Sequence, residues 1–377
     1  MARKGENIYK RKDGRWEGRY ISSYDNAGKA KYSYVYARSY NEVKQKLNTS
    51  KMKPSITAPS MPRTVVRSVA SLSAEWLNTK RLNTKLSTFI RYQNILDNHI
   101  LPQLGDCIIS CLDTVQVKSF VQEKLQKGRL DGKGGLSAKT VTDTLAVLKN
   151  IFKYAQNLGI NTSCDFNQIT IKKNTREMRV LSTNEEKRLI AVLSSEMDRF
   201  KLGVYICLFT GIRIGELCAL QWKHISFVEQ TLKIDQTMQR LQHENKDAVI
   251  KTKVVITEPK SFAAIRTIPL PSFLITILRP FAESPNSFLL SGCSKEFVEP
   301  RTMQNRFKGY LKEGQISNAN FHALRHTFAT RCIELGFEVK ALSEILGHSS
   351  VKITLDKYVH SSMEQKLLNM EKLSRIG

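Results

Sequence analysis

The first fifty residues alternate between apolar and polar positions, which is the pattern of short β-strands with one buried face. Three strands, separated by turns rich in Asp, Asn and Gly, are predicted at residues 7–10, 16–24 and 31–36. A helix predicted at 40–47 would cover one face of the sheet that these strands form.

From residue 65 to Gly159, apolar residues recur every three or four positions, which is the spacing of amphipathic helices. Four helices are predicted, with apolar stripes that include Trp76, Tyr92, Phe120 and Phe152. The predicted caps of the second, third and fourth helices are Ser87, Thr114 and Ser137. Short connections between these helices favour a bundle.

After residue 180 the pattern mixes helices and strands. Ser182 and Glu185 have the spacing of a capping box, so a helix is predicted to begin there. The nearly continuous apolar run 200–209 predicts a buried helix. Strands are predicted at 231–234, 254–257 and 266–270, and mainly helices from Pro271 onward.

Two polar stretches separate these patterns, one with Pro, Ser and Thr and one basic. We therefore expect a multidomain protein, mainly α-helical with small β-sheets. Its predicted parts are a β-rich domain at 1–53, a linker at 54–64, a helical bundle at 65–160, a second linker at 161–179 and a mixed α+β domain at 180–377.

The charge of the chain points to nucleic acid. Fifty-nine Lys and Arg face thirty-four Asp and Glu, for a net charge of +25, and a protein this basic attracts polyanions. Residues 1–53 alone carry nine more basic than acidic side chains. An alternative is that the aromatic residues there form a small core. The candidate DNA contacts are Arg15, Trp16, Arg19, Tyr20, Lys29 and Tyr32.

Other classes of protein fit poorly. The sequence contains no apolar run long enough to span a membrane and no signal peptide after Met1, so a cytoplasmic protein is expected. Seven cysteines without a C-x-x-C pair favour reduced thiols over a zinc site. The sequence shows no P-loop and no metal-ligand cluster, so no cofactor and no metal are expected.

Four short segments of the last domain contain residues suited to phosphate chemistry. They are T-G-I-R-I-G-E-L (210–217), H-A-L-R-H-T (322–327), L-G-H-S-S (346–350) and D-K-Y (356–358). Each has an ordinary alternative when taken alone. Arg213 and Glu216 can form a structural ion pair, and His348 or Tyr358 can be an unremarkable surface or core residue. His322 and His326 have metal-ligand spacing but lack a third ligand.

Together, the order Arg…His-x-x-Arg…His…Tyr resembles the tyrosine recombinase or phage integrase family. The basic β-rich N-terminus resembles the arm-binding domain of integrases from conjugative transposons, and the helical region resembles a core-binding domain. The resemblance implies a site-specific recombinase that integrates, and also excises, a mobile element. It implies the catalytic set Arg213, Lys260, His322, Arg325, His348 and Tyr358.

The resemblance also implies roles for these residues. Tyr358 would attack the phosphorus and leave a 3′-phosphotyrosine, with His322 as general base and Lys260 as general acid. The two arginines would bind the phosphate oxygens, and Glu216 would orient Arg213. Lys260 would lie in a β-hairpin, where Glu258-Pro259-Lys260-Ser261 joins two strands.

Several alternatives stay open. A type IB topoisomerase would use the same chemistry, a DNA-binding regulator would keep only the fold, and a recombinase that resolves chromosome dimers would lack an arm-binding domain. The expected partners are double-stranded DNA at core and arm sites, a tetramer of the chain, and an excision factor or a host bending protein. The apolar stripe Met363, Leu367, Leu368, Met370 and Leu373 predicts a tail helix that packs within the domain or on a neighbouring protomer.

Overall fold

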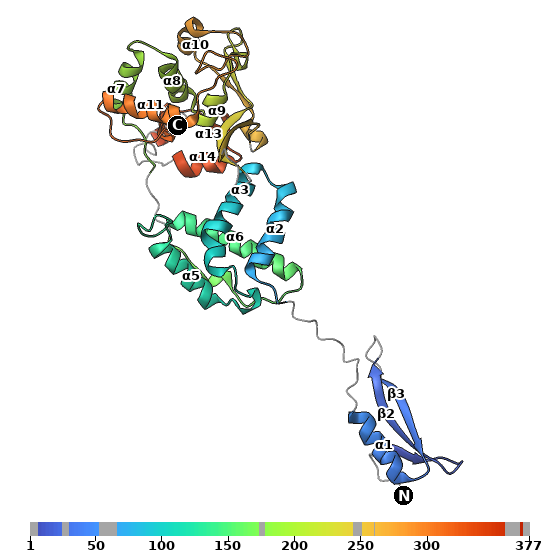
Figure 1. The fold of residues 1–377 in the computed structure, drawn as a ribbon. Helices are drawn as coiled ribbons and strands as arrows, with labels where there is room; N and C mark the ends of the chain where they lie inside the picture. The colour runs from blue at the N-terminus through green and yellow to red at the C-terminus, as the bar shows by residue number, and fades with distance from the viewer. Residues whose placement is uncertain are drawn as a thin grey trace. The chain divides into compact units, whose positions relative to one another are not determined.

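The computed structural model describes residues 7–24, 30–52, 66–172, 178–243, 251–259, 261–358 and 370–371. The chain divides into two compact units, Met1–Thr84 with Tyr92–Lys172 and Lys85–Arg91 with Lys173–Gly377. Figure 1 shows the helices and strands of each. Small antiparallel sheets accompany a mainly helical chain, which confirms the predicted fold class.

The N-terminal sheet has the order β1-β2-β3, with all strands antiparallel. Its elements are β1 (Ile8–Lys10), β2 (Trp16–Tyr24), β3 (Ala30–Ala37) and α1 (Tyr40–Met52), and they confirm the predicted three strands and helix. The helix packs on one face of the sheet around Val43 and Leu47, which are buried. Gly18 permits this contact, because a Cβ there would lie 2.5 Å from Leu47 Cδ1.

The first unit also contains the helical region. Its helices are α2 (Val69–Asn83), the C-terminal part of α3 (Leu86–Ile95), α4 (Leu101–Leu104), α5 (Thr114–Lys127) and α6 (Ala138–Asn157). A π-helical stretch, Leu96–Ile100, joins α3 to α4, so these segments correspond to the second of the four predicted helices. Trp76, Phe120 and Phe152 are buried in one shared core.

The predicted helix caps are partly wrong. Ser137 caps α6 as expected, because its side chain accepts the Thr140 N–H. Ser87 lies inside the first turn of α3, and Thr114 is the first residue of α5 rather than its cap. Asp113 caps α5 instead, since its carboxylate accepts the Gln116 N–H while the Gln116 side chain accepts the Asp113 N–H.

Residues 161–172, predicted as linker, pack on the helical core. The Phe166 ring meets the Phe152 ring edge-on with 5.1 Å between centroids, and Ile169 and Ile171 pack against the same core. The predicted linker at 54–64 lies outside the described residues.

The second unit is built around α8, a helix buried along almost its whole length. The predicted capping box of Ser182 and Glu185 is confirmed at the start of α7. The helices are α7 (Thr183–Ser194), α8 (Arg199–Thr210), α9 (Ile214–Ala219), α10 (Ser272–Leu278), α11 (Pro300–Glu313), α12 (His322–Glu334), α13 (Val339–Leu346) and α14 (Val351–Tyr358) (Figure 1).

The strands of this unit form a three-stranded sheet and a two-stranded ribbon. The sheet contains β4 (Ile225–Ser226), β5 (Thr231–Ile234) and β8 (Arg266–Pro269), and the ribbon pairs β6 (Thr237–Gln242) with β7 (Thr252–Thr257). The sequence did not predict β6, because its many polar residues obscure the alternation of apolar and polar positions typical of a strand. Because β7 and β8 belong to different sheets, the chain between them does not close a hairpin of paired strands, which corrects the expectation for this segment.

Across the described ranges, no helix is long and apolar enough to cross a bilayer. Of the predicted tail helix, only Met370 and Glu371 are described, and both are helical.

Candidate active site

Arg325, on α12, joins the ends of two other helices. Its Nη1 donates to the Gly211 carbonyl at 2.8 Å and its Nη2 to the Leu346 carbonyl at 2.6 Å. These carbonyls lie at the C-terminal ends of α8 and α13, where the helix dipole is negative. Burial and the positive charge of Arg213 lower the Arg325 pKa to about 9, so the group stays protonated at neutral pH.

Gly211 has to be glycine for this contact to form. Its φ is +65°, the left-handed conformation that ends many helices. A Cβ at this position would lie 2.5 Å from Phe328 Cδ1 and 2.9 Å from Leu346 Cδ2. The turn can therefore approach α12 and α13 closely only without a side chain.

Arg213 directly precedes α9, as its N-cap residue, and is held by Glu216. The carboxylate accepts the Arg213 backbone N–H at 2.9 Å and Nη1 at 2.7 Å, while Nη2 reaches the Gly347 carbonyl. Glu216 is 3% exposed and also accepts two hydrogen bonds from Arg266, which donates to the Ile345 carbonyl as well. Burial opposes ionisation of Glu216, but the two arginines outweigh it and lower the carboxyl pKa.

His348 lies in the turn between α13 and α14. Gly347 follows the last residue of α13 with φ +65°, the left-handed conformation that ends many helices. The His348 Nδ1 atom is 2.8 Å from Thr354 Oγ1, a contact that fixes the ring. Partial burial and the charges of Arg325 and Arg213 lower the His348 pKa to about 3, so the ring is neutral at physiological pH.

Tyr358 ends α14 with only 6% of its surface exposed. Its hydroxyl oxygen is 2.9 Å from Nδ1 of His326, and its ring lies parallel to the His348 ring, with 6.3 Å between centroids. Burial raises the Tyr358 pKa, while Arg325 and Arg213 act in the opposite direction. The phenol therefore sits within the electrostatic reach of both arginines.

His322 keeps an exposed surface at the start of α12. Its ring meets His326 edge-on with 4.5 Å between centroids. Partial desolvation and the charges of Arg325 and Arg213 lower the His322 pKa to about 4. Among the described residues, the histidine nitrogen that meets the phenol thus belongs to His326 and not to His322.

The structure links most of the predicted set into one continuous cluster, namely Arg213, Glu216, His322, Arg325, His348 and Tyr358. Lys260 lies outside the described residues. Sequence reasoning missed Arg266, Thr354 and the contact of His326 with Tyr358. The one available signal for Arg266 was its place in a strand that otherwise points apolar side chains inward.

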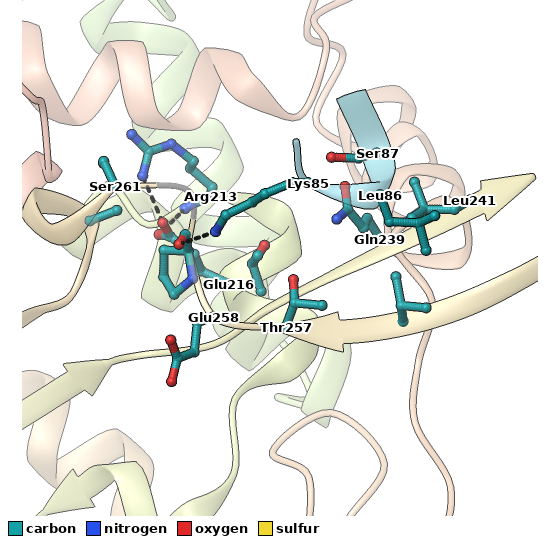
Figure 2. Close-up of a pocket in the computed structure, with 14 residues that line it drawn as sticks. Lys85, Leu86, Ser87, Arg213, Glu216, Gln239, Leu241, Thr257, Glu258 and Ser261 are labelled. Carbon is teal, nitrogen blue, oxygen red and sulfur yellow. Dashed lines mark hydrogen bonds and ion pairs between the residues drawn. The ribbon is translucent and has the colours of Figure 1, made fainter. Parts of the chain in front are cut away.

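A pocket of about 780 Å³ opens beside Arg213 and Glu216 (Figure 2). The β6–β7 ribbon forms one wall, through residues that include Gln239 and Thr257. Pro259 and Ser261, on either side of Lys260, also line it, and Lys85 Nζ donates to the Pro259 carbonyl at 2.8 Å.

The candidate DNA contacts of the N-terminal sheet lie on two different faces. Trp16 and Tyr20 pack with the core under α1. Arg19 lies on the open face, 3.7 Å above the Tyr32 ring. That face also carries the exposed side chains of Tyr34 and Tyr36, which sequence reasoning missed. Arg15 is exposed and pairs with Asp13; Lys29 lies outside the described residues.

A buried arginine, a second arginine that is partly exposed and a buried tyrosine are together the components of a phosphoryl-transfer site. The sequence model of the phage integrase family matches residues 179–365, and the model of the phage integrase N-terminal SAM-like domain matches residues 68–125. The chain belongs to the phage integrase family. It is a tyrosine recombinase, an enzyme that cuts and rejoins DNA at specific sites.

Known proteins resemble the chain over most of its length. A tyrosine recombinase XerC-like protein of Caldanaerobacter subterraneus is 28% identical over 331 residues, which are 81% of this chain and 82% of that protein. The Tn1549 transposon integrase in complex with transposon right end DNA aligns with TM-score 0.65 and 22% identity, over 82% of this chain and 100% of that one. A lambda integrase tetramer bound to a Holliday junction aligns with TM-score 0.56 and 17% identity, over 96% and 99%.

Proposed function

We propose that this recombinase integrates and excises a mobile element, and that Tyr358 is its nucleophile. The observation that carries the proposal is the position of the Tyr358 hydroxyl, buried beside His326 and close to Arg325 and Arg213. Attack on phosphorus would leave a 3′-phosphotyrosine and a free 5′-hydroxyl. The covalent bond conserves the energy of the phosphodiester, so rejoining needs no nucleotide cofactor.

In this proposal the two arginines bind the non-bridging oxygens of the scissile phosphate. Each keeps N–H groups beyond those that hold it in place, because a guanidinium has five. His322 and His348 donate further hydrogen bonds, as neutral rings, to the charge that develops on those oxygens. Glu216 orients Arg213, which it contacts at both the backbone and the side chain.

Lys260 is proposed as the general acid that protonates the departing 5′-oxygen. This role comes from the family resemblance. Its chain neighbours Pro259 and Ser261 line the pocket next to Arg213, which is where such an acid is needed.

We also propose that Tyr358 acts in the active site of its own chain. The Tyr358 hydroxyl, at the end of α14, lies 2.9 Å from Nδ1 of His326 on α12 of its own chain, which supports this proposal. In a tetramer, each protomer would then use its own tyrosine to cleave the DNA strand bound in its own active site.

The two N-terminal regions are proposed as separate DNA-binding domains. Residues 1–53 would bind arm sites through the basic, tyrosine-rich open face of the sheet, and 65–160 would bind core sites. The likeness to the Tn1549 transposon integrase with DNA and to the lambda integrase tetramer supports DNA as substrate and a tetramer as the active assembly. An excision factor or a host bending protein would set the direction of recombination.

The decisive experiment uses a nicked duplex that carries the end of the element, from which the short 5′-hydroxyl fragment diffuses away. Wild-type protein should become covalently attached to the 3′ strand without added metal, and Tyr358→Phe should not. Tyr310→Phe is a matched control, because Tyr310 is also a buried tyrosine of this unit. An adduct that persists in Tyr358→Phe would refute the assignment of the nucleophile, and no adduct despite tight binding would favour a regulator.

Two further assays distinguish an integrase from a topoisomerase and from a recombinase that resolves chromosome dimers. Relaxation of supercoiled plasmid that lacks the element's sites would indicate a topoisomerase. Deletion of residues 1–53 should abolish recombination that depends on arm sites; recombination that survives the deletion would indicate resolution of chromosome dimers.

The tail is proposed to pack on a neighbouring protomer. Deletion of the residues after 362 should then weaken pairing of two sites more than binding to one site. Equal effects on both would contradict the proposal.

A further inference from the structure

We propose that His326 is a catalytic residue that takes the phenolic proton of Tyr358 during strand cleavage and returns it during rejoining. The inference rests on the proposed role of Tyr358 as nucleophile. It differs from the expectation that His322 is the general base. It follows from the contact of the Tyr358 hydroxyl with His326.

Tyr358 needs an acceptor within the protein. Its pKa is raised by burial, and only 6% of its surface is exposed, so bulk water has little access to the side chain. Its ring packs with Ala329, Cys332, Leu342 and Leu346, which offer no base. A proton acceptor has to lie within about 2.6–3.2 Å of the oxygen that loses the proton.

His326 satisfies this requirement, and the other described groups near the site do not. Its Nδ1 is 2.9 Å from the Tyr358 oxygen. Arg325 and Arg213 have no free lone pair. Glu216 is saturated by two arginines, and Nδ1 of His348 is occupied by Thr354.

The groups that face His326 keep its ring neutral, and Nδ1 accepts when the ring proton is on Nε2. They are His322 and Arg325 on α12 and Lys357 on α14. Together with partial burial they lower the His326 pKa to about 4. A bound phosphate would counter these positive charges and make the ring a stronger base at the moment of attack.

The proton and bond changes balance in each direction. In cleavage, the bond from the tyrosine oxygen to phosphorus forms and the bond from phosphorus to the 5′-oxygen breaks. The phenolic proton moves to His326 Nδ1, and the 5′-oxygen takes its proton from the acid assigned to Lys260. Rejoining reverses these steps, and His326 protonates the phenolate as it leaves.

The test compares two leaving groups. In the nicked-duplex assay, His326→Gln should slow adduct formation by roughly 10²–10⁴-fold, the usual contribution of a general base. A second assay uses Tyr358→Phe protein and a strand with a 3′-p-nitrophenyl phosphate, which a 5′-hydroxyl strand attacks. Since p-nitrophenolate leaves without a proton, adding His326→Gln should not change this rate. Adding His322→Gln should slow it, because His322 is assigned to the phosphate oxygens.

Unchanged p-nitrophenol release would also show that the His326→Gln protein is folded and binds DNA. Wild-type-like adduct formation by His326→Gln would overturn the inference, and so would an equal loss in both assays, which would indicate a structural role. Absence of an adduct from wild-type protein would refute the proposed function instead.

Discussion

Replacing Glu216 with Gln should destabilise the second unit more than any single change at an exposed ion pair. The substitution keeps the volume of the side chain but removes a charge that lies between Arg213 and Arg266. Arg266 is 9% exposed and Glu216 is 3% exposed. Removing one partner of a buried pair costs about 3–5 kcal/mol, because the other charge stays buried without compensation.

This free energy translates into a measurable shift. For a unit of this size, each kcal/mol lowers the melting temperature by about 2–4 °C, so a decrease of roughly 6–20 °C is expected. Glu299→Gln is the matched control, because Glu299 pairs with Arg240 at a more exposed position. An exposed pair contributes about 0.2–1 kcal/mol, so this control should melt close to wild type.

Thermal unfolding of the full chain, followed by circular dichroism, gives the comparison. The difference between wild type and Glu216→Gln should also depend on pH. The Glu216 pKa is lowered in the folded protein, so its contribution is complete above the ordinary value of 4.5 and is lost as the pH falls through the lowered one. Equal melting of Glu216→Gln and Glu299→Gln at neutral pH would refute the argument that the buried carboxylate holds the two arginines.

Three further predictions concern the site and the unit that contains it. Arg325→Lys should reduce adduct formation by roughly 10²-fold or more, because one ammonium cannot bind two helix-end carbonyls and a phosphate in the planar geometry of a guanidinium; retained activity would contradict this. Gly211→Ala should lower the melting temperature more than Gly336→Ala, since both residues have positive φ but only Gly211 would place its Cβ against Phe328; equal losses would show that the packing is not tight. Arg179 lowers the Glu185 pKa to about 2, so this pair stabilises the fold above pH 4.5 and less as the pH falls toward 2. Acid titration of stability should therefore be shallower in Glu185→Gln, and an unchanged titration would contradict the assignment.

The sequence predicted the elements whose signal is local. The strands of the N-terminal sheet and helix α8 follow from alternation and from a long apolar run. Strand β6 was missed because its sequence, TMQRLQ, is polar and its pairing with β7 is a tertiary property. Asp113 was passed over in favour of Thr114, since both are good capping residues and only the backbone conformation distinguishes them.

The sequence predicted which residues belong to the candidate site but not which of them contact one another. Motif order identified Arg213, Arg325 and Tyr358, because the resemblance attaches to those positions. Nothing local in the sequence shows that Arg266 reaches Glu216, fifty residues away, or that His326 and not His322 meets the tyrosine. The first contact depends on how β8 packs beside α9 and the second on how α12 and α14 pack, and spacing along the chain determines neither.

The positive charges gathered around Arg325 affect the stability of the protein when no DNA is bound. Burial, and after it the positive charge of Arg213, lowers the pKa of Arg325 there. A phosphate would counter these positive charges, so binding of DNA and resistance to unfolding should rise together. The charges that prepare the enzyme for its substrate would therefore leave the protein without DNA less stable against unfolding than the protein bound to DNA.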